Sequence, residues 1–341
     1  MPSLARLRHL RAFGRMADGF ARLHVIRAGL ELGLFEALRR PQTEAELVGR
    51  TGLAADLLGA WLRTTEAQGL LLRRGAAFEI GPFVRALLDA PEGPALRAML
   101  DQVVLGWGPR FEALPRYLKG AERPVFGSPD EAARVAKASR LVEPRALDAL
   151  GRIPGVERAH RVLDVGCGHG HYLVAFLRRH RDAMGLGIEL DPAVAEEARR
   201  RLLEAEVSRR AEVRAGDFLT LELPPGSFDL AMMNNDLYYF EPARHPEVFR
   251  RALSRLAPGG VLAIQSQVLA TGRLARWLGS ATSGAVFDLF LRVHRNLHGL
   301  PDPATIRAQL REAGFAETGE VDVMPGGGAK YVFGRAPRDG R

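Results

Sequence analysis

Three glycines at alternate positions follow an apolar segment near the middle of the chain. Residues 162–170 read Val-Leu-Asp-Val-Gly-Cys-Gly-His-Gly, and apolar residues at helical spacing come next. Gly166, Gly168 and Gly170 let the backbone turn sharply and come close to a ligand, and a helix after them presents free N–H groups. A dinucleotide fingerprint needs its third glycine at position 171, where this chain has a histidine. The motif therefore predicts a strand, turn and helix that hold a nucleoside ligand without a pyrophosphate.

Acidic residues stand where the next two strands are expected to end. Glu189 lies at the end of the apolar segment 185–190, and Asp217 and Phe218 close the segment 211–218. Strands that alternate with helices form a parallel sheet, so these side chains are expected at the carboxyl edge of that sheet. Glu189 can accept both hydroxyl groups of a ribose, Asp217 can accept from an adenine amino group, and Phe218 can cover the base. Each acid taken singly is more often a solvated side chain, but their register after successive strands favours binding.

Four motifs occur in a familiar order between residues 160 and 335: LDVGCGHG, the acid in GIEL, the triplet GDF and the turn LAPGG. In this order they resemble a class I S-adenosylmethionine-dependent methyltransferase. The segments 316–324 and 330–335, joined by Pro-Gly-Gly-Gly, resemble the antiparallel hairpin that ends the family's sheet. The resemblance implies an α/β fold with a Rossmann-like methyltransferase sheet, an antiparallel terminal hairpin, and S-adenosylmethionine as cofactor. The residues that we expect to bind this cofactor are Asp164, Gly166, Gly168, Gly170, Glu189, Asp217, Phe218 and Asn234.

The first 90 residues have a mainly helical pattern that indicates a winged helix. A capping-box sequence opens a short helix at Thr43, a second helix follows over 54–68, and residues 70–80 indicate a hairpin. The second helix carries Arg63 as its only cation, so we prefer dimerisation to DNA reading. A winged helix before a methyltransferase resembles the small-molecule O-methyltransferases of bacterial and plant secondary metabolism, in which this module forms dimers. The apolar stripe from Phe20 to Leu34, with Trp61, is expected to contribute to the shared interface of a homodimer.

The predicted organisation is a winged-helix dimerisation domain over 1–90, a helical connector over 91–158 and a catalytic domain over 159–337. In the connector, Trp107 and Phe111 belong to an apolar helical stripe that is either interdomain core or a wall of the substrate pocket. A second candidate wall is the apolar segment 285–297. Further residues expected to line the pocket are Asn235, Tyr238 and Tyr239.

The pattern departs from the O-methyltransferases that it resembles at the proton acceptor, because those enzymes usually have a catalytic histidine just after the fourth strand. Here that place reads Met-Asn-Asn-Asp-Leu-Tyr-Tyr-Phe over 233–240, without a histidine. Asp236 is a candidate base, although it can instead cap the following helix or hold the ammonium group of the cofactor. His294 and His298, expected on one helix face, are further candidates, and His245 is expected on a surface turn. An acidic substrate or a carbon nucleophile needs no strong base.

Composition bounds the class of protein. The chain has 341 residues, a net charge of +8 and a pI of about 10.3. Only three of its 48 lysine and arginine residues are lysines. This bias toward arginine indicates genome composition rather than a nucleic-acid site. No apolar run is long enough to span a membrane, and no secretory signal is recognisable. The single cysteine, Cys167, fits a reducing cytoplasm and a packing role. The histidines are scattered along the sequence, so we expect no metal site.

These patterns together predict a cytoplasmic, dimeric methyltransferase. Its acceptor is expected to be a small, largely apolar metabolite that is methylated at a hydroxyl oxygen. Two alternatives stay open: C- or N-methylation of a related scaffold, and a winged-helix transcriptional regulator that senses the cofactor.

Overall fold

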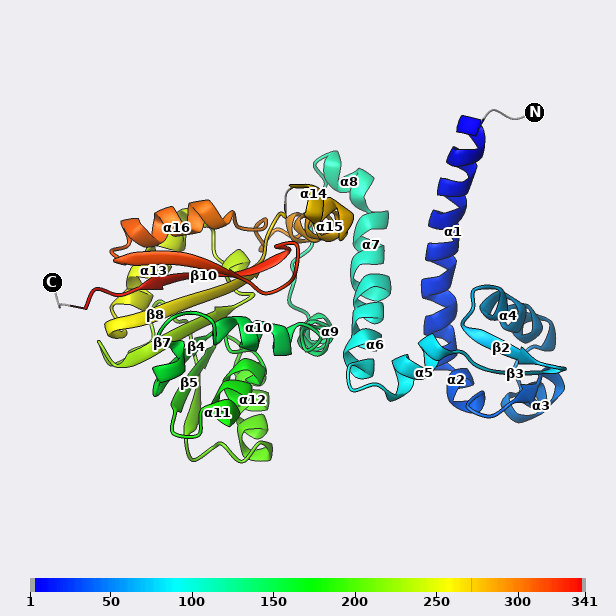
Figure 1. Cartoon of the computed structure of the whole chain (residues 1–341), viewed down its shortest axis with the longest axis horizontal. Coiled ribbons are helices and arrows are strands. Elements are labelled where there is room, and N and C mark those ends of the chain that lie inside the picture. Colours follow the sequence, from blue (N-terminus) through cyan, green and yellow to red (C-terminus); the bar gives the residue numbers. More distant parts are fainter. Residues whose placement is uncertain (1–3, 271, 339–341) are drawn as a thin grey trace. The chain divides into compact units, whose positions relative to one another are not determined.

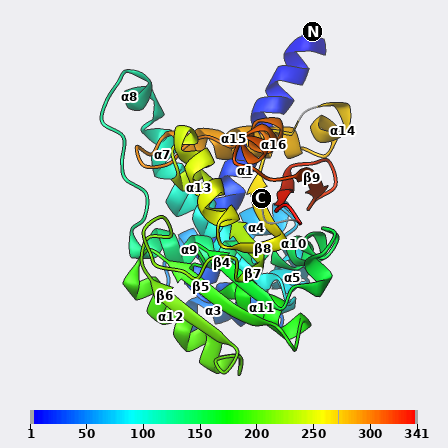
Figure 2. The same ribbon diagram turned by 90° about the vertical axis from the view of Figure 1, so that its left-hand side faces the viewer.

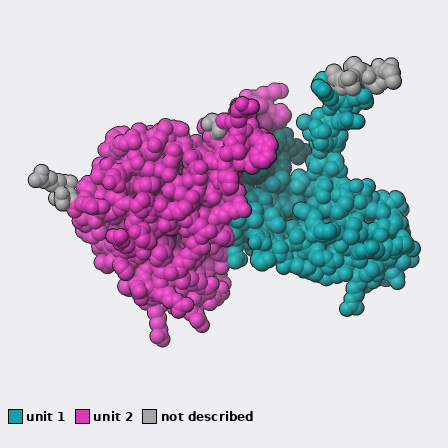
Figure 3. Space-filling model, in the orientation of Figure 1, with its two compact units in different colours: residues 1–112, 129–141 teal, residues 113–128, 142–341 magenta. Residues whose placement is uncertain are grey.

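The computed structural model describes residues 4–270 and 272–338, and the chain divides into two compact units (Figures 1 and 3). Unit 1 comprises Met1–Glu112 and Pro129–Leu141, and unit 2 comprises Ala113–Ser128 and Val142–Arg341. The predicted connector over 91–158 is therefore shared between the two units. Within the described residues, no helix combines the length and the apolar content that crossing a bilayer requires.

Unit 2 is built on one seven-stranded sheet with the strand order β6-β5-β4-β7-β8-β10-β9. The strands from β4 to β8 are parallel, whereas β10 pairs antiparallel with both β8 and β9. The predicted fold class and the terminal hairpin are confirmed. The bounds are Arg161–Val165 (β4), Met184–Glu189 (β5), Ala211–Ala215 (β6), Phe228–Asn234 (β7), Leu256–Gln267 (β8), Glu317–Asp322 (β9) and Ala329–Arg335 (β10).

Helices cover both faces of this sheet (Figures 1 and 2). Successive side chains of a strand point to opposite faces, so Val162 packs with helices α10, α11 and α12, whereas Leu163 packs with α13 and α16. Each face thus has its own apolar core, and the strand ends are left to carry polar groups. The helices of unit 2 are α8 (Leu114–Leu118), α10 (Glu143–Leu150), α11 (His171–Arg179), α12 (Pro192–Glu204), α13 (His245–Leu253), α14 (Gly272–Trp277), α15 (Ser280–Arg292) and α16 (Pro303–Glu312).

Two expected strand limits are different in the structure. The third strand ends at Ala215, because Gly216 and Asp217 turn the chain. The turn expected at Pro258–Gly260 lies inside the long strand β8, where Gly259 has a φ of 76° and the register toward β7 shifts between Phe228 and Leu230. Proline cannot donate to a ladder, so a local irregularity lets the strand continue past it.

Unit 1 contains the helices and the hairpin that the sequence predicts. Thr43 accepts the N–H of Glu46, and the Glu46 carboxylate accepts the N–H of Thr43, so the capping box is confirmed. Whether this module acts as a winged helix stays a prediction. Its elements are α1 (Leu4–Glu31), α2 (Leu34–Ala37), β1 (Gln42–Thr43), α3 (Glu44–Thr51), α4 (Ala55–Ala67), β2 (Leu71–Arg74), β3 (Ala77–Ile80), α5 (Pro82–Asp89), α6 (Gly93–Asp101), a π-helical segment (Gln102–Trp107), α7 (Gly108–Glu112) and α9 (Pro129–Ser139).

The apolar stripe assigned to a shared interface lies mostly in the core of unit 1. Leu34 is buried, and Trp61 packs on Phe35 with ring centroids 5.4 Å apart while its Nε1–H donates to the Val25 carbonyl at 3.0 Å. Phe20 is instead 68% exposed. The exposed apolar side chains of α1 continue from Phe20 toward the N-terminus as Met16, Phe13, Leu10 and Leu7.

Candidate functional site

The glycine loop joins β4 to α11 in left-handed backbone conformations. Gly166, Gly168 and Gly170 have φ values of 63°, 52° and 74°, which residues with a Cβ rarely adopt. A Cβ added at Gly168 would have no neighbour within 4 Å among the described residues, so this side of the loop is open. The predicted strand, glycine turn and helix are therefore present, with room for a ligand at the loop.

Three carboxylates from neighbouring strands lie around this loop. In the sheet Val165 pairs with Ile188 of β5 and with Met233 of β7, so Glu189 and Asn234 come at the same level as the start of the loop. Glu189 accepts the N–H of Gly168 at 2.9 Å through Oε2 and that of Asp191 at 3.0 Å through Oε1.

Asp164 and Asp236 complete the group. Asp164 is the next to last residue of β4 and is 1% exposed. Asp236 follows β7 and lies directly over the loop, because a Cβ added at Gly166 would come within 2.5 Å of the Asp236 Cγ and Oδ2 atoms. The absence of a side chain at Gly166 is what admits the Asp236 carboxyl. We call Asp164, Glu189 and Asp236 the acidic cluster.

Several buried polar atoms at this place have no hydrogen-bond partner within the described chain. They are Asp164 Oδ2, Asp236 Oδ2, Asn234 Nδ2 and the hydroxyl of Tyr172. The buried Tyr331 sets the orientation of Asn234, because its hydroxyl donates to Asn234 Oδ1 at 2.8 Å. A buried polar atom without a partner costs about 1–3 kcal/mol, so a polar or charged ligand that satisfies these atoms gains affinity. The same donors and acceptors fit a cationic, amine-bearing nucleoside.

Burial changes the proton affinity of the acidic cluster. It raises the pKa of the Asp164 carboxyl from 3.8 to about 7; the Asn234 side chain opposes this rise, and the charge of Glu189 adds to it. Burial also raises the pKa of Asp236 well above its usual 3.8, and the charges of Glu189 and Asp164 raise it further. The pKa of the Cys167 thiol is raised by burial as well, which keeps this residue a neutral packing group.

The two residues predicted to contact adenine lie after β6. Asp217 is exposed, and its Oδ1 accepts the N–H of Leu219 at 2.9 Å, whereas Phe218 is 4% exposed and packs in the core with residues of β4 and β7. Their roles toward a nucleoside stay predictions.

An aromatic cluster begins two residues after Asp236. Phe126 contacts the rings of Tyr239, Phe290 and His294, with centroids 6.4, 6.1 and 5.4 Å apart. Tyr238 contacts the ring of Phe287 at 6.0 Å. Phe126 was not predicted, because it lies more than a hundred residues before its partners; Asn296 holds it through two hydrogen bonds to its backbone. The aromatic cluster consists of Phe126, Tyr238, Tyr239, Phe287, Phe290 and His294.

The two histidines expected on one helix face are not on a helix. The helix α15 ends at Arg292, where Asp288 bridges to Arg292 at 2.8 Å and accepts the N–H of Leu300 at 2.6 Å, so the chain turns back. His294 is fully buried, and its Nδ1 lies 2.8 Å from the Phe290 carbonyl. The backbone N–H of His298 donates to the Tyr238 carbonyl at 2.8 Å.

Two further expectations about candidate bases are wrong. His245 is buried at the start of α13 rather than on a surface turn, because its ring packs against Phe249 and meets the Phe240 carbonyl. Asp236 precedes a short 3-10 helix, but its side chain makes no capping hydrogen bond. Its carboxyl is directed to the glycine loop instead.

Trp107 and Phe111 belong to unit 1. Trp107 ends the π-helical segment, Phe111 lies in α7, and their ring centroids are 6.2 Å apart. Their assignment to a substrate pocket stays a prediction.

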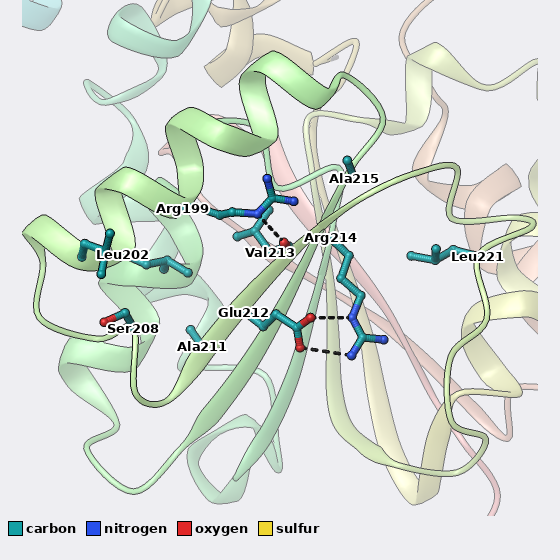
Figure 4. A pocket seen from close by; sticks show the side chains of 10 residues that line it. Arg199, Leu202, Ser208, Ala211, Glu212, Val213, Arg214, Ala215 and Leu221 are labelled. Carbon is teal, nitrogen blue, oxygen red and sulfur yellow. Dashed lines mark hydrogen bonds and ion pairs between the residues drawn. The ribbon is translucent and has the colours of Figure 1, made fainter.

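An open groove of about 640 Å³ runs along the outer strand β6 (Figure 4). Its lining includes the ion pair between Glu212 and Arg214 at 2.8 Å. None of the residues predicted for the site lines this groove, so the acidic cluster remains the candidate cofactor site.

Comparison with known proteins agrees with this geometry. Residues 162–260 match a family model described as a methyltransferase domain. The chain is 31% identical over 347 residues to demethylspheroidene O-methyltransferase of Cereibacter sphaeroides, which covers 94% of this chain and 87% of that protein. The chain belongs to the S-adenosylmethionine-dependent O-methyltransferases. Its cofactor is S-adenosylmethionine, and the orphaned atoms of the acidic cluster fit a cation of this kind.

Two further proteins are similar to this O-methyltransferase. The 27-O-demethylrifamycin SV methyltransferase of Amycolatopsis mediterranei is 27% identical over 194 residues, which cover 57% of this chain and 66% of that relative. The solved structure of an O-methyltransferase family protein from Burkholderia thailandensis has a TM-score of 0.79 at 22% identity and covers both chains completely, so the two share one fold.

The stability of the cofactor-free methyltransferase is expected to depend on Asp164 and pH. The pKa of Asp164 is about 7 in the folded protein and 3.8 in the unfolded chain. The stability that this residue contributes is therefore fully present below pH 3.8 and is lost as the pH rises through 7. Asp164→Asn should therefore stabilise the free protein progressively over this window, by up to about 4 kcal/mol above it. Urea unfolding at several pH values measures the difference, and an unchanged difference from acid to neutral pH would contradict the burial of an ionisable Asp164.

Proposed function

We propose that this O-methyltransferase methylates a hydroxyl oxygen of a small, largely apolar, aromatic metabolite. The observation that carries the proposal is the position of the aromatic cluster, which follows the acidic cluster along the chain. Burial raises the pKa of Tyr238 well above its usual 10, and the charges of Tyr239 and Asp236 raise it further. Tyr238 and Asp236 therefore interact electrostatically. An acceptor bound on these rings is thus next to the cofactor. The names of the two relatives, both methyltransferases acting on demethyl compounds, support methyl transfer to oxygen.

The proposed cofactor contacts follow the geometry of the loop. Asp164 and Asp236 face the ammonium and sulfonium charges, Asn234 donates through Nδ2, and Glu189 accepts from the ribose. Asp217 and Phe218 bind the adenine, while the backbone of Gly166, Gly168 and Gly170 approaches the ligand closely. Asn235 and Tyr239 are proposed to line the acceptor pocket.

The chemistry is an in-line displacement at carbon. S-adenosylmethionine, when bound, would supply an electrophilic methyl group. The acceptor oxygen bonds to the methyl carbon as the carbon–sulfur bond breaks, and the electron pair of the broken bond stays on sulfur. The residues of this chain contribute alignment and exclusion of water, effects worth about 7–11 kcal/mol when the geometry is good. The acceptor proton must also be removed.

We assign the role of base to His294. Its Nδ1 lies 2.8 Å from the Phe290 carbonyl, which fits an imidazole that donates through Nδ1. The contact of its ring with Phe290 in the aromatic cluster supports this assignment. Asp236 is less suited to the task, because it lies against Gly166 on the cofactor side.

A homodimer and a cytoplasmic location are also proposed. The exposed apolar side chains of α1, from Leu7 to Phe20, form a larger apolar surface than a single unit needs, which supports pairing with a second copy. The only cysteine is buried and unpaired, in agreement with a reducing compartment.

Methyl transfer is tested with S-adenosylmethionine that carries a labelled methyl group and a panel of hydroxylated aromatic compounds. Each hydroxylated compound is matched to an analogue whose hydroxyl is replaced by hydrogen. We expect label in a methyl ether for the hydroxylated compounds alone. Label on carbon or nitrogen, or in the deoxy analogues, would contradict the proposal.

Substitution of His294 tests the base. His294→Gln should lower kcat by about 10²–10⁴-fold, because general base catalysis contributes that much, and should leave cofactor affinity unchanged. His298→Gln is the matched control, since only the backbone of His298 makes the hydrogen bond to Tyr238. Full activity of the His294 variant with a slow His298 variant would reverse the assignment.

Light scattering of the purified protein tests the dimer. Phe13, which is 70% exposed on α1, is replaced by glutamate, and Leu57, which is 69% exposed on α4, receives the same change as a control. We expect a dimer for the wild type and the Leu57 variant and a monomer for Phe13→Glu, because a charge is costly in an apolar interface. A monomeric wild type at micromolar concentration would refute the proposal.

A further inference from the structure

The acidic cluster is a site of unbalanced negative charge. Within the described chain, none of Asp164, Glu189 and Asp236 forms an ion pair with a lysine, arginine or histidine. The groups that interact with Asp236 are the carboxylates Glu189 and Asp164, the phenols Tyr172 and Tyr238, and the thiol of Cys167, none of them a cation.

The backbone of Asn235 holds Asp236 in place at a conformational cost. Asn235 has a φ of 61°, one of two residues other than glycine with a positive φ in the described chain, and its N–H donates to the Gln265 carbonyl at 2.9 Å. This turn carries the chain away from β7 and brings the Asp236 carboxyl onto Gly166. Asparagine adopts this left-handed conformation more readily than most residues, and the turn leaves Asp236 Oδ2 buried without a partner, which indicates a position suited to ligand binding.

We propose that Asp236 makes the site selective for the cationic cofactor over the product that remains after methyl transfer. This inference rests on the proposed function of the acidic cluster. S-adenosylmethionine has two positive charges, on its ammonium and its sulfonium, whereas S-adenosylhomocysteine keeps only the ammonium because the departing methyl leaves its bonding electron pair on sulfur. After methyl transfer, the carboxylate of Asp236 no longer has a sulfonium charge to balance it.

The three acids differ in a way that singles out Asp236. Glu189 already accepts two backbone N–H groups, and Asp164 lies within the buried strand β4 beside Asn234. Asp236 shares with Asp164 a buried Oδ2 without a partner, but it alone lies outside the strands, directly over Gly166 in space that a side chain at 166 would fill. Burial and the neighbouring carboxylates favour the protonated form of Asp236 in the free site, the sulfonium of the bound cofactor favours the ionised form, and loss of the sulfonium charge favours protonation again. Protonation then lowers the affinity for the product and promotes its release.

Calorimetric titration of the full-length enzyme with S-adenosylmethionine and with S-adenosylhomocysteine tests the inference. Asp236→Asn should weaken binding of S-adenosylmethionine about tenfold or more and affect S-adenosylhomocysteine much less, because an opposite charge nearby favours the ionised carboxylate. Glu241→Gln, an exposed acid on the same segment, is the control and should change neither affinity. Equal losses for both ligands, or no loss, would overturn the proposal.

A second measurement on the wild type covers the case in which the variant does not fold. Titrations at about pH 7 in two buffers of different ionisation enthalpy give the protons released, which should be more numerous for S-adenosylmethionine than for S-adenosylhomocysteine. The ratio of the two affinities should also rise from about pH 5 to about pH 8 as the carboxyls ionise. Equal proton release and a constant ratio would overturn the inference while leaving the proposed function intact. A wild type that binds neither ligand would instead refute the proposed function.

Discussion

The site depends on like charges that are brought together at the ends of adjacent strands. Asp164, Glu189 and Asp236 repel one another, and two of them have a buried oxygen with no partner in the described chain. Such an arrangement costs stability in the free protein, since burial disfavours the charged form and neighbouring carboxylates disfavour it further. A bound cation offsets this destabilisation, and the sulfonium cofactor is a cation. The glycine loop and the turn at Asn235 bring the Asp236 carboxyl over Gly166, and Tyr331 restrains the neighbouring Asn234.

The register of the parallel sheet produces this arrangement from residues that are far apart in the chain. Val165 lies between Ile188 and Met233, so the residues that follow each of these three strands meet at one level. Gly166 then leaves the space that the Asp236 carboxyl occupies. The aromatic cluster continues from the same segment, since Tyr238 and Tyr239 follow Asp236 closely in the chain.

The sequence predicted the sheet, the loop and the acids after it, because strand periodicity and glycine spacing are local signals. It did not predict Phe126 or Tyr331, whose partners lie 170 and 97 residues away, since no local pattern carries such pairings. The helix expected through His294 and His298 was wrong because Asp288 satisfies both Arg292 and the N–H of Leu300 and so ends α15 early. Glycine at 166 was read as room for a ligand, whereas its near neighbour is the Asp236 side chain.

In the free enzyme, burial and the neighbouring carboxylates favour the protonated forms of Asp164 and Asp236, and binding of the cationic cofactor is expected to favour their ionised forms. Carboxyl carbon NMR of the enzyme with labelled aspartate, assigned through Asp164→Asn and Asp236→Asn, follows each group directly over a pH titration. The account predicts that Asp164 titrates near 7 in the free enzyme and becomes ionised at the same pH when S-adenosylmethionine is added. A carboxyl of Asp164 that titrates near its ordinary value of 3.8 with and without the cofactor would contradict the account.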